Sequence, residues 1–185
     1  MPIDIAALRA RKKPRQQTVT LILDPDVEEQ LVTARDQRTE AQQRADRTPG
    51  NSAAAADLAA ANERVEQAEA AARDESVTFV FKALGREAYE QMKDAHRPTK
   101  KQRDDYKAKG LAMGFAEFQV GDLGYNLDTF PPALVAASCI EPEMTLDDAQ
   151  ALWDSDEFSS AELGDLFAAA MTVNETSRRI DLGKG

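Results

Sequence analysis

The chain has 185 residues, a formal net charge of −10 and a pI near 4.7, which argue against a general nucleic-acid-binding protein because such proteins carry a basic face. No apolar run approaches the roughly 20 residues of a membrane-spanning helix, and no apolar segment follows the N-terminal basic cluster, so neither a membrane segment nor a secretory signal is predicted. The single cysteine, Cys139, excludes an internal disulfide and favours a reducing, cytosolic setting.

The N-terminal part begins with a basic segment and continues into a strand. Residues 1–17 carry lysines and arginines around Pro14 without apolar periodicity, so we expect a flexible basic arm. The β-branched and apolar run Thr18–Leu23 predicts a strand, which Asp24 and Pro25 end. Because aspartate suits a helix N-cap and proline suits the first helical position, the same pair predicts the start of a helix.

Two long helices follow, over Pro25–Arg47 and Ala53–Arg73, separated by the breaker Thr48–Ser52. Small and apolar residues recur in both at alternating steps of about three and four residues, which indicates an antiparallel helical hairpin with an alanine-rich seam. A second strand is predicted over Ser76–Phe81. Residues 18–81 therefore form a strand–hairpin–strand segment, in which we expect the hairpin to project from the body and the strands to pair at its base.

Residues 82–176 alternate amphipathic stretches with glycine and proline breaks, which predicts a compact helical body. The expected helices cover 85–95, 99–109, 133–140, 145–153 and 159–174. We expect Phe115 and Phe118, in the glycine-rich segment 110–129, to be buried, and 177–185 to be a flexible tail. The predicted fold class is mostly α-helical with a small two-stranded β element.

Almost all of the negative charge lies in the last third of the chain. Residues 110–185 contain 14 acidic and 3 basic side chains, whereas residues 1–109 contain 19 acidic and 20 basic ones. Apolar residues recur at helical spacing within the acid, so we interpret the end of this region as an acidic helix pair. Thr145 and Ser159 are predicted to cap the two helices, the latter in a capping box with Glu162. Such an acidic surface favours a binding protein over an enzyme.

Residues that could support catalysis or metal binding are sparse. His96, the only histidine, stands at a predicted helix end, where the helix dipole favours a cation, and no nucleophile signature accompanies it. Cys139 is expected to be a small buried side chain on a helix. The acidic run from Asp154 departs from a calcium loop at most defining positions, since Phe158 stands where an oxygen ligand is needed. We therefore predict no enzyme, no cofactor and no metal site.

Two features stay open between a structural and a binding role. The basic helix 99–109 is either a solvated face or an electrostatic contact with the acidic helices of the same or a neighbouring copy, which would make a homo-oligomer. Trp153, the only tryptophan, either packs in the core or anchors a partner, because tryptophan is common among interface hot spots.

A family resemblance rests on four stretches in the second half of the chain. They are Val77–Tyr89 followed by Asp94–Pro98, then Phe130–Pro142, then Leu152-Trp153, and then the final helix ending Ala-Ala-Met-Thr-Val-Asn174. In this order and spacing they resemble the tail assembly chaperones of long-tailed bacteriophages, especially those infecting actinobacteria. The resemblance covers roughly residues 76–176, about half the chain, and none of the stretches is a catalytic signature.

The resemblance implies a non-enzymatic protein of the host bacterial cytoplasm that binds the tape measure protein. Such a chaperone keeps that long helical protein soluble until tail-tube subunits polymerise around it, and it is not expected in the mature virion. Family members are often made in two lengths by a programmed ribosomal frameshift, so the long form is a second expected partner. Because glycine and lysine codons can form slippery runs, the ending Gly183–Gly185 suggests the hypothesis that this chain is the short product.

We predict the partner contact on the apolar stripe of the acidic helix pair, which could instead belong to the protein's own core. The stripe comprises Leu152, Trp153, Leu163, Leu166, Phe167 and Met171. Such a pair can cover an apolar helix, and its negative charge keeps the complex in solution. The alternative function is a structural virion protein, a tail or head–tail joining subunit in which the hairpin is a bracing arm.

Overall fold

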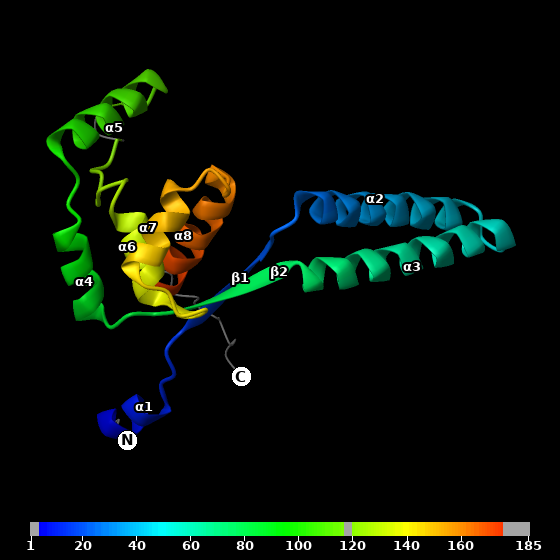
Figure 1. The fold of residues 1–185 in the computed structure, drawn as a ribbon, viewed down its shortest axis with the longest axis horizontal. Coiled ribbons are helices and arrows are strands. Elements are labelled where there is room, and N and C mark those ends of the chain that lie inside the picture. Colours follow the sequence, from blue (N-terminus) through cyan, green and yellow to red (C-terminus); the bar gives the residue numbers. More distant parts are fainter. Residues whose placement is uncertain (1–3, 117–119, 176–185) are drawn as a thin grey trace, which may run out of the picture. The chain divides into compact units, whose positions relative to one another are not determined.

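The computed structural model describes residues 4–116 and 120–175, the side chains of Leu8 and Arg9 excepted (Figure 1). These residues form eight helices and three strands in one small sheet, so the predicted fold class, mostly α-helical with a small β element, is confirmed. The predicted tail 177–185 and Phe118 lie outside the described residues.

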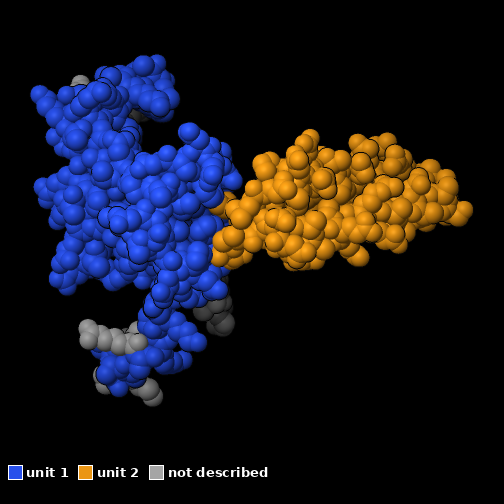
Figure 2. All heavy atoms as spheres, in the orientation of Figure 1, with its two compact units in different colours: residues 1–19, 79–185 blue, residues 20–78 orange. Residues whose placement is uncertain are grey.

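The chain divides into two compact units, which Figure 2 colours separately. Unit 1 comprises residues 1–19 and 79–185, and unit 2 comprises residues 20–78. Both boundaries fall inside strands, β1 (Gln16–Ile22) and β2 (Ser76–Lys82), so each of these strands contributes residues to both units.

The strands β1 and β2 are neighbours in a sheet of order β1-β2-β3. The backbone N–H of Leu23 donates to the carbonyl of Glu75 at 2.8 Å, and the N–H of Ala83 donates to the carbonyl of Arg15 at 3.0 Å. Residue numbers therefore fall along one strand as they rise along the other, which makes the pair antiparallel, a direction that the sequence left open.

The third strand corrects the predicted two-stranded element. β3 (Cys139–Glu141) pairs antiparallel with β2, whereas the sequence predicted a helix through Ile140. The preceding helix ends at Ser138. Glu141 precedes a proline, and the residue before a proline disfavours helical backbone. The backbone N–H and C=O groups that no longer take part in the helix pair with β2 instead, so they are satisfied without a helix.

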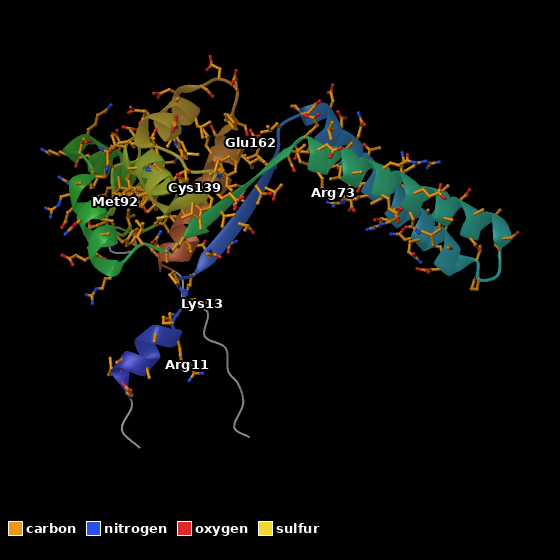
Figure 3. The ribbon with its side chains drawn as sticks, turned by 60° about the horizontal axis from the view of Figure 1, so that its bottom comes forward. Arg11, Lys13, Arg73, Met92, Cys139 and Glu162 are labelled. Carbon is orange, nitrogen blue, oxygen red and sulfur yellow. The ribbon has the colours of Figure 1, made fainter. Side chains whose placement is uncertain are left out.

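The N-terminal segment contains regular structure that the sequence did not predict. Residues Ile5–Arg11 form α1, and β1 begins two residues before the expected Thr18. The carboxylate of Asp4 accepts a hydrogen bond from the N–H of Ala6 at 2.9 Å, so an aspartate cap opens the helix. Lys13 lies between α1 and β1 (Figure 3). The segment 1–17 is therefore not wholly irregular.

Unit 2 contains the antiparallel hairpin of α2 (Pro25–Arg47) and α3 (Ser52–Asp74), whose bounds match the prediction to within one residue. Asp24 caps α2 as predicted, because its carboxylate accepts from the N–H of Asp26 at 2.9 Å. The buried seam consists of Leu31, Ala34 and Ala41 on α2 and Ala54, Ala61, Val65 and Ala72 on α3. Alanine side chains allow close approach of the helices but bury little apolar area, so each contact stabilises the hairpin modestly.

Unit 1 contains the remaining helices of the body. They are α4 (Arg86–Ala95), α5 (Lys100–Ala112), α6 (Phe130–Ser138), α7 (Leu146–Asp154) and α8 (Ser160–Glu175). Seven of the nine residues of α6 are buried, and α4, α7 and α8 pack against it (Figure 1). A helix that is apolar on all sides is expected to lie at the centre of a core, and α6 does so.

The acids of α7 and α8 serve largely as helix caps. The hydroxyl of Thr145 accepts from the N–H of Asp148 at 3.1 Å, and the carboxylate of Asp148 accepts from the N–H of Thr145 at 2.9 Å. Ser159 and Glu162 form the same reciprocal pair at 3.2 and 2.7 Å, with Glu162 in the first turn of α8 (Figure 3). Hydrogen bonds from these hydroxyl residues hold the pKa of both carboxyls below their usual values. The predicted capping is confirmed.

Candidate partner-binding groove

The apolar stripe predicted on α7 and α8 is turned towards the interior of unit 1 to different degrees. Leu166 has no exposed surface and belongs to the core. The other five members are half-buried: Leu152, Trp153, Leu163, Phe167 and Met171. None of the six ranks among the exposed large apolar side chains of the described residues. The stripe therefore packs mainly within the protein itself, and little of its apolar surface is free to contact a partner.

An aromatic cluster accounts for the position of Phe167. Its ring meets the ring of Phe130 at a centroid distance of 6.1 Å and that of Tyr125 at 5.6 Å, both edge to face. Phe130 is fully buried, stacks on Tyr125 at 4.6 Å and lies 6.4 Å from the ring of Tyr89. Such aromatic pairs each contribute about 0.5–1.5 kcal/mol beyond the area they bury. Phe167 is thus a core contact between α8 and α6.

The C-terminal end of α8 is tied to the start of the body by polar contacts. The hydroxyl of Tyr89 donates to the carboxylate of Glu175 at 2.6 Å and lies 3.6 Å from the sulfur of Met171. Burial, and then the neighbouring Glu175, raise the pKa of Tyr89 well above its usual value. The side-chain oxygen of Asn174 accepts from the N–H of Leu84 at 2.9 Å. Met171 therefore also lies among contacts that hold the fold.

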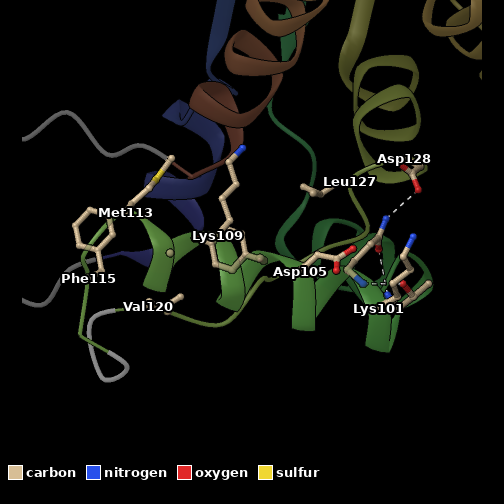
Figure 4. A pocket seen from close by; sticks show the side chains of 13 residues that line it. Lys101, Asp105, Lys109, Met113, Phe115, Val120, Leu127 and Asp128 are labelled. Carbon is tan, nitrogen blue, oxygen red and sulfur yellow. Dashed lines mark hydrogen bonds between the residues drawn. The ribbon is translucent and has the colours of Figure 1, made fainter.

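Exposed apolar surface lies instead beside α5. A cavity of about 880 Å³ is lined by α5 and its cap Thr99 and by residues 113, 115, 120, 121, 127 and 128 (Figure 4). Its large apolar lining side chains are Tyr106, Met113, Phe115, Val120 and Leu127. Met113 is 65% exposed and Phe115 is 54% exposed, so the prediction that Phe115 is buried was wrong. We call this feature the α5 groove.

One face of α5 forms a wall of the groove. Gln102, Tyr106, Lys109 and Met113 follow one another at steps of three or four residues, which places them on one side of a helix. No residue of α5 is buried, so this side of the helix stays largely exposed within the described part of the chain. A Cβ atom on Gly110 would lie 2.7 Å from a methyl carbon of Val120, and the glycine therefore permits the close approach of that side chain.

Hydrogen bonds hold α5 to the segment opposite it. The side-chain amide of Gln102 donates to Asp128 at 2.9 Å and to the side-chain oxygen of Asn126 at 3.1 Å. The N–H of Asn126 donates to the carbonyl of His96 at 2.7 Å, and Nδ1 of His96 lies 2.9 Å from the hydroxyl of Thr129. His96 therefore joins the end of α4 to the start of α6, which agrees with the structural role predicted for it.

The electrostatics of α5 are opposite to those of the acidic helix pair. α5 contains five cations (Lys100, Lys101, Arg103, Lys107 and Lys109) against two carboxylates (Asp104 and Asp105). Residues 146–175 contain eight carboxylates and no lysine or arginine. Lys101 and Lys109 line the groove, and neither forms an ion pair within the described part of the chain. The groove thus combines apolar side chains with two cations that lack a carboxylate partner there.

Cys139 is buried as predicted, although it stands in β3 and not on a helix. Its sulfur lies 3.2 Å from the carbonyl oxygen of Pro142, which accepts a hydrogen bond from the thiol. Burial raises the pKa of the Cys139 thiol, so the reactive thiolate is disfavoured at neutral pH. Within residues 4–116 and 120–175, no three His, Cys, Asp or Glu side chains gather as metal ligands would.

Comparison with known proteins assigns no family. No protein-family model matches the sequence, and no curated protein or solved structure shows significant similarity to it. Among the described helices, none has both the length and the hydropathy of a bilayer-spanning segment. The one sequence signal that could have indicated the groove is the run Leu111–Phe115, in which large apolar residues directly follow a basic helix.

Proposed function

We propose that this protein is a bacteriophage tail assembly chaperone, which binds the tape measure protein and keeps it soluble during tail-tube assembly. The family assignment rests on the four sequence stretches that resemble such chaperones. The observation that favours a binding role is the α5 groove, where Met113 and Phe115 present apolar surface to solvent. The protein acts in the host cytoplasm, without catalysis, and is released before the virion matures.

The shape and composition of the α5 groove suit a helical partner. An amphipathic helix can lay its apolar face into a groove that a single helix and a facing segment enclose. Large apolar residues that gather on a surface mark interaction sites more often than residues that occur singly. Because the tape measure protein is long and helical and exposes apolar surface before assembly, it is the partner that the resemblance provides.

In this proposal the partner contact lies at the α5 groove, whereas the sequence alone predicted it on the acidic helix pair. Leu166 is fully buried, and Phe167 and Met171 contact aromatic side chains of the body. Leu152, Trp153 and Leu163 are half-buried and would contribute only at the edge of an interface. Truncation before α7 is a poor test for this reason, because it would uncover the core helix α6 and unfold unit 1.

Point variants in the groove provide the sharper test. The chain, wild type or with Met113→Asp and Phe115→Asp together, is co-expressed with the tape measure protein encoded by a neighbouring gene. We expect the wild type to bring the tape measure protein into the soluble fraction and to co-purify with it. The double variant should lose about 90% of this yield or more, because two carboxylates replace apolar contacts at an interface centre.

Leu146→Asp is the matched control, since Leu146 is 52% exposed and opens α7, where an acid suits the helix N-terminus. It should leave the yield unchanged. Loss of binding in this control alone would place the interface on the acidic pair. Absence of co-purification with the wild type would overturn the proposed function, and so would multiple copies of the chain in purified virions, which would identify a structural subunit.

We also propose that a longer, frameshifted form of this protein is a second partner, as the family resemblance implies. The nucleotide sequence of the gene tests this proposal directly. A slippery heptamer with an overlapping downstream frame is expected, and the absence of either one contradicts the idea.

A further inference from the structure

We infer that the α5 groove accepts an amphipathic helix whose apolar stripe is flanked by carboxylates. This inference specifies the chemistry of the partner and rests on the proposed function, in which the groove is the binding site. The occupant is a segment of another protein, and neither a second copy of this chain nor a small molecule. Charge, exposure and length each support this choice.

The charges of α5 favour acidic residues on either side of the apolar stripe of a bound helix. Lys101 and Lys109 stand eight residues apart on α5, about 12 Å along its axis. Neither has an ion-pair partner among the described residues, whereas the carboxylate of Asp128 in the same lining already accepts from Gln102 at 2.9 Å. Asp105 is the remaining acid of the lining, and it stands between the two lysines. A partner gains attraction here by bringing acids, which pair with the two lysines.

Exposure argues against a second copy as the occupant. The chain's own acidic helices would supply the matching charge, but their apolar stripe is half-buried and Leu166 is fully buried. Leu146 is the one large apolar residue of α7 or α8 that is exposed in the described structure. Two copies joined groove to groove would bring two cationic α5 helices together, and like charges disfavour that contact.

Length sets the size of the occupant. The 13 residues of α5 extend over about 20 Å, at roughly 1.5 Å per residue. Along this length, Met113 and Phe115 lie at one end of the groove and Lys101 lies at the other, with Lys109 between them (Figure 4). A helix of three to four turns would therefore place apolar residues against the first end and acids along the rest.

Two designed peptides of about 14 residues, four helical turns, test the inference. They share one stripe of leucine and alanine and differ only in the flanks, which carry glutamate in one peptide and lysine in the other. Binding of each labelled peptide to the full chain is measured by fluorescence anisotropy at low salt and at high salt. We expect the glutamate peptide to bind about tenfold more tightly at low salt, with a smaller difference at high salt because salt screens the charges.

The variant Lys101→Glu with Lys109→Glu should reverse this preference. Its matched control is Lys12→Glu with Lys13→Glu, which changes the net charge equally at exposed residues outside the groove and should keep the wild-type preference. Met113→Asp should weaken binding of both peptides. Equal binding of the two peptides, no binding of either, or an unchanged preference in the groove variant would each overturn the inference.

Two further results separate this inference from the proposed function. Co-purification of the tape measure protein that survives Met113→Asp would keep the proposed function and overturn the inference. Binding of the glutamate peptide by a chain that does not bind the tape measure protein would do the opposite. Self-association of the wild type in sedimentation experiments, abolished by Met113→Asp, would show that a second copy occupies the groove and would also overturn the inference.

Discussion

The acidic helix pair α7–α8 and the basic helix α5 use the same kinds of residue for different purposes. In the pair, acids such as Asp148 and Glu162 cap helix ends, and the apolar residues face the aromatic core. In α5 no residue is buried, and large apolar side chains in α5 and just after it, such as Tyr106, Met113 and Phe115, are exposed to solvent. The region with the larger charge imbalance therefore serves mainly the fold, and α5 with the residues just after it carries the proposed binding surface.

This difference shows that an amphipathic pattern identifies the apolar face of a helix. The pattern does not tell whether that face packs in the protein's own core or stays open to a partner. The stripe on α8 is covered by the chain's own α6. The face of α5 has a comparable spacing, but none of its residues is buried. Only the packing of the whole body distinguishes the two cases, because both patterns satisfy the same local rule.

Truncating one apolar side chain in each region should give the largest difference in the free energy of unfolding. Leu166→Ala should lower the free energy of unfolding by about 2–5 kcal/mol, because it leaves a cavity in the core. Met113→Ala should change it by less than about 0.5 kcal/mol, since the side chain is mostly exposed. Urea denaturation followed by circular dichroism measures both. Similar losses in the two variants would show that the two regions do not differ as described.

Replacing one glycine by alanine in each region should give a smaller difference in stability, and here the variant of the acidic pair is the one that gains stability. Gly164 lies in α8, and beyond the adjoining helix backbone no atom lies within 4 Å of the place that an added methyl group would take. Gly164→Ala should therefore stabilise the protein by about 0.5–1 kcal/mol through helix propensity. Gly110→Ala should lose that gain, because its methyl group would meet Val120 at 2.7 Å. Thermal unfolding of the two variants measures the difference, and a stabilisation of the same size at Gly110 would mean that Val120 does not pack on α5.

The smallest expected effect is the pH dependence of the α8 cap. Hydrogen bonds from Ser159 hold the pKa of Glu162 below its usual value of about 4.5. The ionised carboxylate therefore contributes stability above that value, and the contribution is lost as the pH falls through the lowered pKa of the folded state. Glu162→Gln should reduce the free energy of unfolding by about 0.3–1 kcal/mol at pH 7.

The difference between the wild type and Glu162→Gln should shrink below about pH 4.5 and vanish when the carboxyl is protonated in both states. Denaturation curves recorded from neutral to acidic pH would follow this change. A difference that stays constant over the whole range would show that the charge of Glu162 plays no part in the cap.

The sequence predicted features that depend on local signals. The bounds of α2 and α3 follow from Asp24, from the breaker at 48–52 and from the alanine periodicity, all of which lie within the elements themselves. The capping box at Ser159 was predicted for the same reason. Such signals act over a few residues, so no knowledge of tertiary packing was needed to read them.

Features that depend on distant partners were not predicted. β3 exists because Cys139 and Glu141 find partners on β2, about 60 residues earlier in the chain. The exposure of Phe115 was missed because an apolar side chain is buried more often than not, and its sequence neighbours do not indicate otherwise. The stripe on α8 was recognised, but its orientation follows from the rings of Tyr125 and Phe130.

The hairpin of unit 2 is flanked by Leu23 and Glu75, which one backbone hydrogen bond joins at 2.8 Å. The hairpin stands between two neighbouring strands, because the chain leaves along β1 and returns along β2. The entropy of closing such an excursion grows only slowly with its length. The arms could therefore be extended, trimmed or exchanged over 24–74 while the strand register stays the same, and natural size variation should concentrate there.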